Sequence, residues 1–260
     1  MNDIDDTKAP LLDHLIELRR RLLWSVGALG IAFAGCLYVA RPIFAFLVQP
    51  LLRAGQGKVI YTEIFEAFFV EIKVAFFAAL MIAFPVMATQ LWRFVAPGLY
   101  AKEKKAFLPF LLMTPVLFTA GAAMAYYVAM PIALKYLLGY SGNIGGIQQE
   151  ALPGVGNYLS FVMKFIFGFG LAFLLPVLLM ILERAGIVTR DGLKKGRRYA
   201  IVAIVAVAAV LTPPDIMSQV LLAVPLMLLY EFAIIAIWFT GRKRAKEEAI
   251  EGAAEEAIVE

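Results

Sequence analysis

The chain has 260 residues, of which 62% are hydrophobic and 17% are charged, and its formal net charge is +4. Soluble globular domains carry about a quarter charged residues, so this composition excludes a soluble domain and predicts an integral membrane protein. The single cysteine, Cys36, excludes an internal disulfide and a thiolate metal cluster.

Six stretches nearly free of charge are predicted to span a bilayer as helices, since a span needs roughly 20 apolar residues. The fifth stretch is short: at about 1.5 Å per residue it reaches about 20 Å of a roughly 30 Å core. The sixth is also short if it ends at Glu231, and two short helices would thin the bilayer. The stretches are 22–40, 74–92, 107–134, 158–182, 199–211 and 220–239.

The segments between and beyond these stretches have patterns of their own. A charged amphipathic helix is expected just before the first stretch, which lacks a cleavage pattern and is predicted to be a retained helix. The loop 40–64 carries Pro50 and predicts a short interfacial helix followed by a break, and the loop 139–156 is glycine-rich and predicted to be irregular. We expect one domain, 1–246, and a frayed acidic, alanine-rich tail, 247–260.

Basic residues mark the cytoplasmic ends of membrane helices and so predict the orientation. They gather in alternate loops, which places both termini in the cytoplasm. This bias also explains the net charge, so no nucleic-acid partner is predicted. The residues on the predicted cytoplasmic side are Lys8, Arg19, Arg20, Arg21, Arg93, Lys102, Lys104, Lys105, Arg184, Arg190, Lys194, Lys195, Arg197, Arg198, Arg242, Lys243, Arg244 and Lys246.

Prolines within the predicted spans are expected to bend the helices, because each removes a backbone hydrogen bond. Bent helices can enclose a concave face. The prolines within or at the edges of spans are Pro85, Pro109, Pro115, Pro131, Pro176 and Pro225.

Signatures of enzymes are missing or misplaced. The sequence has no phosphate-binding loop and no H-E-x-x-H pair, and one histidine, His14, cannot form a multi-histidine site. The run Gly139-Tyr140-Ser141-Gly142 matches the G-x-S-G of intramembrane serine proteases, but His14 is predicted to lie on the opposite side of the membrane from Ser141. We therefore predict no catalysis and no cofactor or metal.

Four motifs in order along the chain resemble the TatC family, the receptor subunits of the twin-arginine protein translocase. The resemblance extends from about Leu11 to Glu231. The motifs are H-L-x-E-L-R-x-R (His14, Leu15, Glu17, Leu18, Arg19, Arg21), F-x-x-P-x-L-x-x-x-E (Phe94, Pro97, Leu99, Glu103), Tyr158-Leu159-Ser160-Phe161, and Leu211-Thr212-Pro213-Pro214-Asp215 with Ser218-Gln219.

The resemblance implies a glove-shaped, all-α protein of six transmembrane helices in the bacterial cytoplasmic (inner) membrane. Such a protein is not an enzyme. It would bind Arg-Arg signal peptides of folded cargo at its cytoplasmic face. It would also assemble with the single-span proteins TatB and TatA and with other TatC copies, and would depend on the proton-motive force.

Glu17 and Glu103 are the candidate partners of the two signal-peptide arginines, because each guanidinium can take a bidentate carboxylate. The alternative for Glu17 is an ion pair with Arg21 in the same helix, four residues away. The alternative for Glu103 is a charge-balanced loop. Ion pairs alone are too weak for a micromolar complex, so apolar contacts must contribute. The other candidates for binding the signal peptide are Leu18, Arg19, Phe94, Pro97 and Leu99. For Phe94 and Pro97 the alternative is ordinary packing at the membrane interface.

Polar residues at membrane depth mark contact surfaces unless they are paired. Thr212, Gln219 and Glu231 border the last two spans and are candidates for contacting a partner helix. Asp215 could instead cap the last helix. Lys73 is expected to reach the outer interface along its apolar stem.

One position departs from the family pattern. The family commonly has an acidic or amide residue two positions before the proline of the fourth span, where this chain has Leu174. Gln219, Thr212 or Lys164 could replace that contact with a partner helix, or the partner helix could be apolar there. Lys164 and Glu231 also leave open a second function, a proton-coupled transporter of a small anion, with Lys73 as a further binding group.

Overall fold

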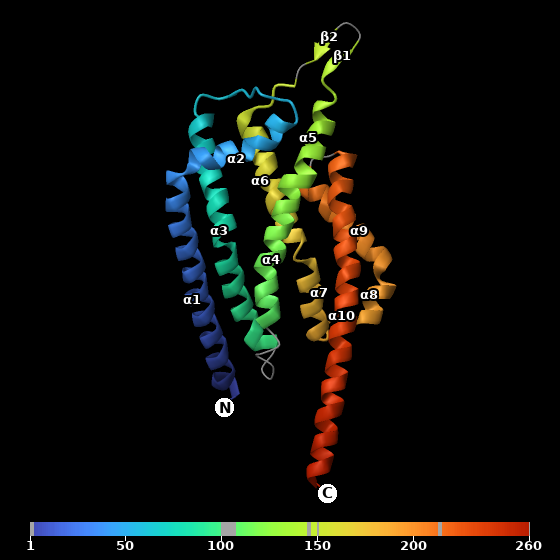
Figure 1. Cartoon of the computed structure of the whole chain (residues 1–260). Coiled ribbons are helices and arrows are strands. Elements are labelled where there is room, and N and C mark those ends of the chain that lie inside the picture. The colour runs from blue at the N-terminus through green and yellow to red at the C-terminus, as the bar shows by residue number, and fades with distance from the viewer. Residues whose placement is uncertain (1–2, 100–107, 145–146, 150, 213–214, 260) are drawn as a thin grey trace. The chain divides into compact units, whose positions relative to one another are not determined.

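The structure is a computed structural model that describes residues 3–99, 108–144, 147–149, 151–212 and 215–259. Side chains are described for 14–94, 110–141, 151–212 and 215–241. The chain divides into two compact units, residues 1–170 and 171–260, and each is described by itself. Figure 1 labels their helices and strands.

The first unit is built mainly from long helices. The helices that come first along the chain are α1 (Asp3–Tyr38), α2 (Ala40–Arg53), α3 (Glu66–Leu99), α4 (Leu108–Met124), the π-helix η2 (Ala125–Ala129) and α5 (Met130–Leu138). The strands β1 (Gly142–Ile144) and β2 (Ile147–Gln149) and the helix α6 (Val155–Ala172) follow.

Among its described residues, the second unit consists of helices and the turns that connect them. It contains α7 (Leu175–Arg184), α8 (Arg190–Lys195), α9 (Arg197–Leu211) and α10 (Ile216–Val259).

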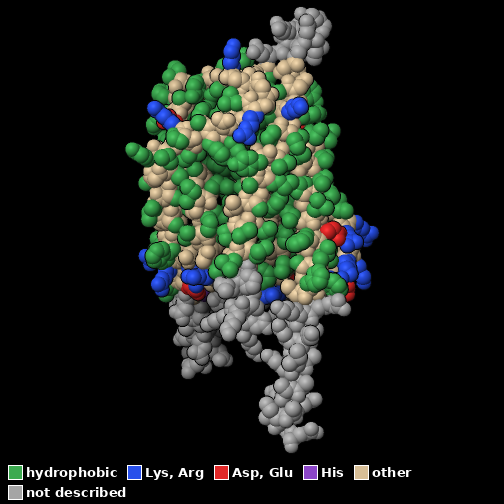
Figure 2. Space-filling model, viewed as in Figure 1, with side chains coloured by type: hydrophobic (Ala, Val, Ile, Leu, Met, Phe, Trp, Pro, Cys, Tyr) green, Lys and Arg blue, Asp and Glu red, His purple; other side chains and the backbone are tan. Residues whose placement is uncertain are grey.

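Five helical stretches of the described chain are long and apolar enough to cross a membrane: 14–38, 66–94, 110–138, 155–184 and 216–241. Their outward faces are apolar, as Ile31 in α1 shows with an exposed fraction of 79%. On the face in Figure 2, hydrophobic side chains cover the long helices and Lys and Arg lie toward helix ends. The fifth predicted span corresponds to α9, whose 15 residues reach only about 22 Å. A sixth crossing there stays a prediction.

Several boundaries differ from the sequence-based expectations. The amphipathic segment and the first span form one continuous helix, α1. The second predicted span ends at residue 92, but α3 continues to Leu99. The last helix passes Glu231 and continues to Val259, because the alanine, glutamate and lysine residues after Gly241 favour helix. The loop 139–156 is not wholly irregular, since β1 and β2 pair as an antiparallel hairpin within it.

Pro176 explains a break in the fourth predicted span. The stretch is two helices, because α6 ends at Ala172 and α7 begins at Leu175. A proline has no N–H to donate and is tolerated in the first turn of a helix, where Pro176 lies. Leu174, the position that departs from the family pattern, is the N-cap residue of α7.

The core of the first unit holds α2, α4 and α6 in place. Tyr158 of α6 donates a hydrogen bond from its hydroxyl to the carbonyl of Leu47 in α2, at 3.0 Å. The ring of Phe118 in α4 is stacked on Phe84 of α3 and lies against Gly170 of α6. The short helix predicted in the loop 40–64 is α2, which ends at Arg53, and Pro50 is buried within it.

Candidate functional site

Two of the sequence motifs meet where the first helix packs on the third. The imidazole of His14 in α1 is stacked on the ring of Phe94 in α3, with centroids 4.2 Å apart and planes 19° apart. This contact places α1 at residue 14 beside the last turns of α3. The motif around Glu17 and the motif that begins at Phe94 therefore share one end of the first unit.

Glu17 is already paired within its own helix. Arg21 donates from Nε to Glu17 Oε1 at 3.0 Å and donates from Nη2 to the same oxygen. This is the alternative that the i, i+4 spacing predicted, and it satisfies only one carboxylate oxygen among the described residues. A ligand guanidinium that binds Glu17 bidentately must therefore compete with Arg21.

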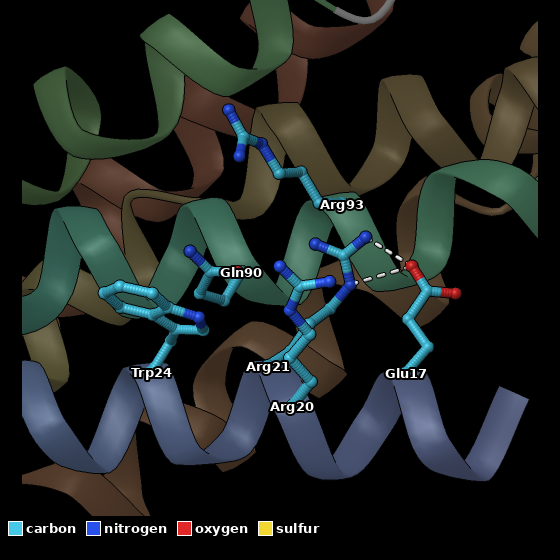
Figure 3. A pocket seen from close by; sticks show the side chains of 6 residues that line it. All are labelled: Glu17, Arg20, Arg21, Trp24, Gln90 and Arg93. Atoms are coloured by element: carbon cyan, nitrogen blue, oxygen red, sulfur yellow. Dashed lines mark hydrogen bonds and ion pairs between the residues drawn. The ribbon is translucent and has the colours of Figure 1, made fainter.

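A pocket of about 520 Å³ lies beside this ion pair. In Figure 3, four of its side chains rise from α1 and two come from α3. Three guanidinium groups and one carboxylate line it, so its formal charge is +2. The lining residues are Glu17, Arg20, Arg21, Trp24, Gln90 and Arg93.

Of the lining residues, only Glu17 and Arg21 belong to the sequence motifs. Arg20 and Arg93 were interpreted only as signals of orientation, and Trp24 and Gln90 were not singled out. Their gathering depends on the rotation of α1 against α3, which a single sequence does not contain. The nearest signal was the 3-to-4-residue spacing of Glu17, Arg20, Arg21 and Trp24, which puts them on neighbouring positions of one helix.

The other predicted peptide-binding residues are only partly described. Leu18 and Arg19 are exposed on α1 and line no part of the pocket. Pro97 and Leu99 lie in the last turns of α3, and their side chains are outside the described residues. Glu103 lies outside the described residues altogether, so its role as the partner of a signal-peptide arginine stays a prediction.

Two of the polar residues predicted to contact a partner helix are hydrogen-bonded within the second unit. Thr212 is buried, and its hydroxyl donates to the carbonyl of Ala208 at 2.8 Å. Gln219 donates from Nε2 to the carbonyl of Val205 at 3.3 Å. Each keeps free acceptor capacity, so these bonds lower the cost of membrane burial without excluding a partner.

Asp215 caps the last helix, as the sequence suggested. Its Oδ1 accepts a hydrogen bond of 2.7 Å from the backbone N–H of Ser218, the third residue of α10. Its Oδ2 and the hydroxyl of Ser218 are buried without a partner among the described residues. The cap explains the position of Asp215 but leaves two polar atoms to be satisfied.

Glu231 has a counter-charge. Its Oε2 accepts a hydrogen bond of 2.7 Å from Nη2 of Arg197 at the start of α9. The two side chains are 45% and 50% exposed. This ion pair connects α9 to α10 and keeps the carboxylate in a polar setting.

The lysines in the predicted spans are exposed. Lys73 in α3 and Lys164 in α6 both have exposed side chains, as lysines that reach an interface along their apolar stems would have. Near Lys73, Glu71 pairs with Arg41 at 3.4 Å.

Glu66 joins two segments that the sequence analysis did not connect. Its carboxylate accepts hydrogen bonds from the backbone N–H of Thr62 and, at 2.6 Å, from that of Gly156 in the first turn of α6. A Cβ at position 156 would lie 2.8 Å from Glu66 Oε1, so the Glu66 carboxylate would have to shift to accept a larger residue there. Glu66 thereby fixes the start of α6 against the start of α3.

Pro85 lies within α3 without ending it. Its carbonyl accepts a hydrogen bond of 2.7 Å from the hydroxyl of Thr89. Such back-bonding gives the Thr89 hydroxyl a partner within a span and is common where helices bend. The helix continues past this proline to the pocket.

Comparison with known proteins agrees with the motifs and with this fold. A family model described as Sec-independent protein translocase protein (TatC) matches residues 13–225. A TatC protein of Magnetococcus marinus is 49% identical over 255 residues, 97% of this chain and 93% of its own length. A TatC protein of Aquifex aeolicus is 40% identical over 238 residues, 90% of this chain and 97% of its own.

Two solved structures have the same fold. A crystal structure of the twin arginine translocase receptor TatC gives a TM-score of 0.74 at 39% identity and covers 87% of this chain and 98% of its own. A second crystal structure of that receptor, in DDM, gives a TM-score of 0.75 at 39% identity. The match covers 86% of this chain and 98% of the chain in that structure. The chain therefore belongs to the TatC family of Sec-independent protein translocase proteins.

Proposed function

We propose that this TatC-family chain is the receptor for Arg-Arg signal peptides of folded proteins and that the end of α1 and α3 is its binding site. The observation that carries the proposal is the stacking of His14 on Phe94, which brings the Glu17 motif and the Phe94 motif to one place. As a member of the family, the chain is a core subunit of the twin-arginine translocase.

Glu17 is proposed to receive one arginine of the peptide and Glu103 the other. The Glu17 carboxylate has one oxygen without a partner among the described residues, which supports its availability to a ligand. An exposed pair contributes at most about 1 kcal/mol, whereas a micromolar complex needs about 8 kcal/mol. The apolar part of the signal peptide is therefore proposed to lie against exposed apolar faces of the helices.

The orientation and the partners follow as part of the same proposal. The distribution of basic residues supports both termini in the cytoplasm and six crossings of the bacterial inner membrane. We propose TatB, TatA and further copies of TatC as partners and the proton-motive force as the energy source. The role is binding and scaffolding, not catalysis.

The decisive experiment is a double-mutant cycle between receptor and peptide. Purified protein with Glu17→Ala or Glu103→Ala is titrated with a labelled Arg-Arg peptide and with its Lys-Lys counterpart. We expect each variant to weaken Arg-Arg binding and to reduce the penalty of the lysine change, because the lost bidentate geometry is common to both changes.

Glu71→Ala provides the matched control. Glu71 is a carboxylate near the opposite end of α3, about 33 Å away along the helix axis from Arg93. Its removal is expected to leave peptide binding unchanged. Additive losses, with coupling below about 0.3 to 0.5 kcal/mol for both glutamates, would show that neither contacts the peptide arginines.

A further inference from the structure

We propose that the pocket between α1 and α3 binds the phosphodiester headgroup of an anionic phospholipid. The pocket is lined by Glu17, Arg20, Arg21, Trp24, Gln90 and Arg93 and measures about 520 Å³. Its volume is within the range of about 300–1,000 Å³ that is typical of small-molecule sites.

The charges of the pocket favour an anion. Arg21 is held by Glu17, whereas Arg20 and Arg93 are exposed and have no ion-pair partner among the described residues. Among the described residues, these two guanidinium groups therefore face one cavity without a counter-charge. A phosphodiester offers two oxygens in the geometry that a planar guanidinium binds.

The position of the pocket favours a lipid over a soluble anion. Arg20 lies within the first two turns of the span 14–38, and Arg93 is the last residue but one of the span 66–94. The pocket is therefore at the end of two membrane helices, the level at which lipid headgroups lie. Basic pockets between transmembrane helices at this level are suited to anionic headgroups.

The surroundings of the pocket suit the rest of a lipid molecule. Trp24 is 63% exposed, and an indole with an apolar ring and one N–H donor is typical of the membrane interface. Leu23 on α1 and Leu91 on α3 are 61% and 59% exposed. Acyl chains attached to a headgroup in the pocket could pack against such apolar side chains. A free phosphate has no acyl chains and would gain nothing from them.

The test counts lipids retained by the purified full chain in a neutral detergent by native mass spectrometry. The probes are phosphatidylglycerol and phosphatidylcholine with identical acyl chains, and inorganic phosphate in a separate arm. We expect wild-type protein to retain phosphatidylglycerol in preference to phosphatidylcholine. Arg20→Gln and Arg93→Gln should each lower phosphatidylglycerol affinity about fivefold, which corresponds to about 1 kcal/mol per basic residue.

Arg19→Gln is the matched control, because it removes the same charge from the same helix without lining the pocket. It should leave the retention of phosphatidylglycerol unchanged. The elution volume in size-exclusion chromatography verifies that each variant is folded. Substitution of exposed arginines is not expected to change it. Equal retention of the two lipids, an equal loss in Arg19→Gln, or displacement of the lipid by inorganic phosphate would each overturn the proposal. No peptide is used, so the result is independent of the receptor function.

Discussion

Arg197 and Glu231 form a hydrogen-bonded ion pair of 2.7 Å that joins the beginning of α9 to the middle of α10. Both side chains are about half exposed, so the pair is of the kind that contributes at most about 1 kcal/mol. It gives a polar residue of the last predicted span a fixed partner inside the second unit. This bears directly on the transporter alternative, in which Glu231 would carry a proton.

Glu231→Gln should therefore lower the melting temperature of the purified protein by no more than about 4 °C, the shift expected for about 1 kcal/mol in a protein of this size. Protein export should persist. Glu183→Gln removes a carboxylate from α7 that has no ion pair among the described residues and is the control. If Glu231→Gln abolished proton-driven uptake of a small anion into proteoliposomes while stability was kept, the transporter function would be favoured instead.

Arg21 competes with any ligand for Glu17, which makes its removal informative. Arg21→Gln should raise the affinity for an Arg-Arg peptide about twofold, because an i, i+4 ion pair is worth about 0.3–0.5 kcal/mol. Titration with a labelled peptide measures the change. Arg20→Gln removes the same charge without a bond to Glu17 and should have a smaller effect. A weaker complex with Arg21→Gln would mean that Arg21 holds Glu17 in its binding position.

Gly170 is required by the ring that lies against it. A Cβ at this position would lie 2.7 Å from Cε2 of Phe118, whose exposed fraction is only 2%. Gly170→Ala should lower the free energy of unfolding by about 1–3 kcal/mol, as overpacking of a core does. Unfolding in mixed micelles measures the loss. Gly35→Ala on α1 is the control, since no atom lies within 4 Å of its new Cβ. Phe118→Leu should recover part of the stability, and failure of that rescue would argue against overpacking.

The proposed orientation can be tested with two exposed lysines. In a Cys36→Ala background, Lys58→Cys in the loop between α2 and α3 should react with an impermeant maleimide in intact spheroplasts. Lys194→Cys in α8 should react only after the cells are opened. Cys36 is buried, so its replacement removes background labelling without changing the surface. Reaction of Lys194→Cys from outside would invert the topology and move the proposed peptide site out of the cytoplasm.

The apolar stretches predicted most of the helices because burial in lipid imposes a strong and local constraint on sequence. Their ends were harder to predict, since they depend on polar residues that can continue a helix. The segment after Phe94 and the tail after Gly241 have such residues, and α3 and α10 continue into both. The break at Leu174 was not predicted, although Pro176 was recognised as a source of bending.

The candidate site was predictable only where it depends on neighbours along one helix. The ion pair between Glu17 and Arg21 follows from their spacing. The contribution of Arg93 does not, because it comes from a helix more than 70 positions later in the chain. The link from Glu66 to Gly156 was missed for the same reason, since 90 residues separate them.

The π-helix η2 has a consequence for how the chain tolerates changes in length. A π turn accommodates about one residue more than the α-helical turn it replaces. Its bulge keeps Tyr126 stacked on Phe46, with the Tyr126 hydroxyl 2.7 Å from the Phe46 carbonyl. Deleting the exposed Tyr127 would let a regular α-helix pass through, and the faces of α4 and α5 would keep their relative rotation because the bulge already takes up the extra residue. Natural length variation of one residue in this helix should therefore concentrate at 125–129.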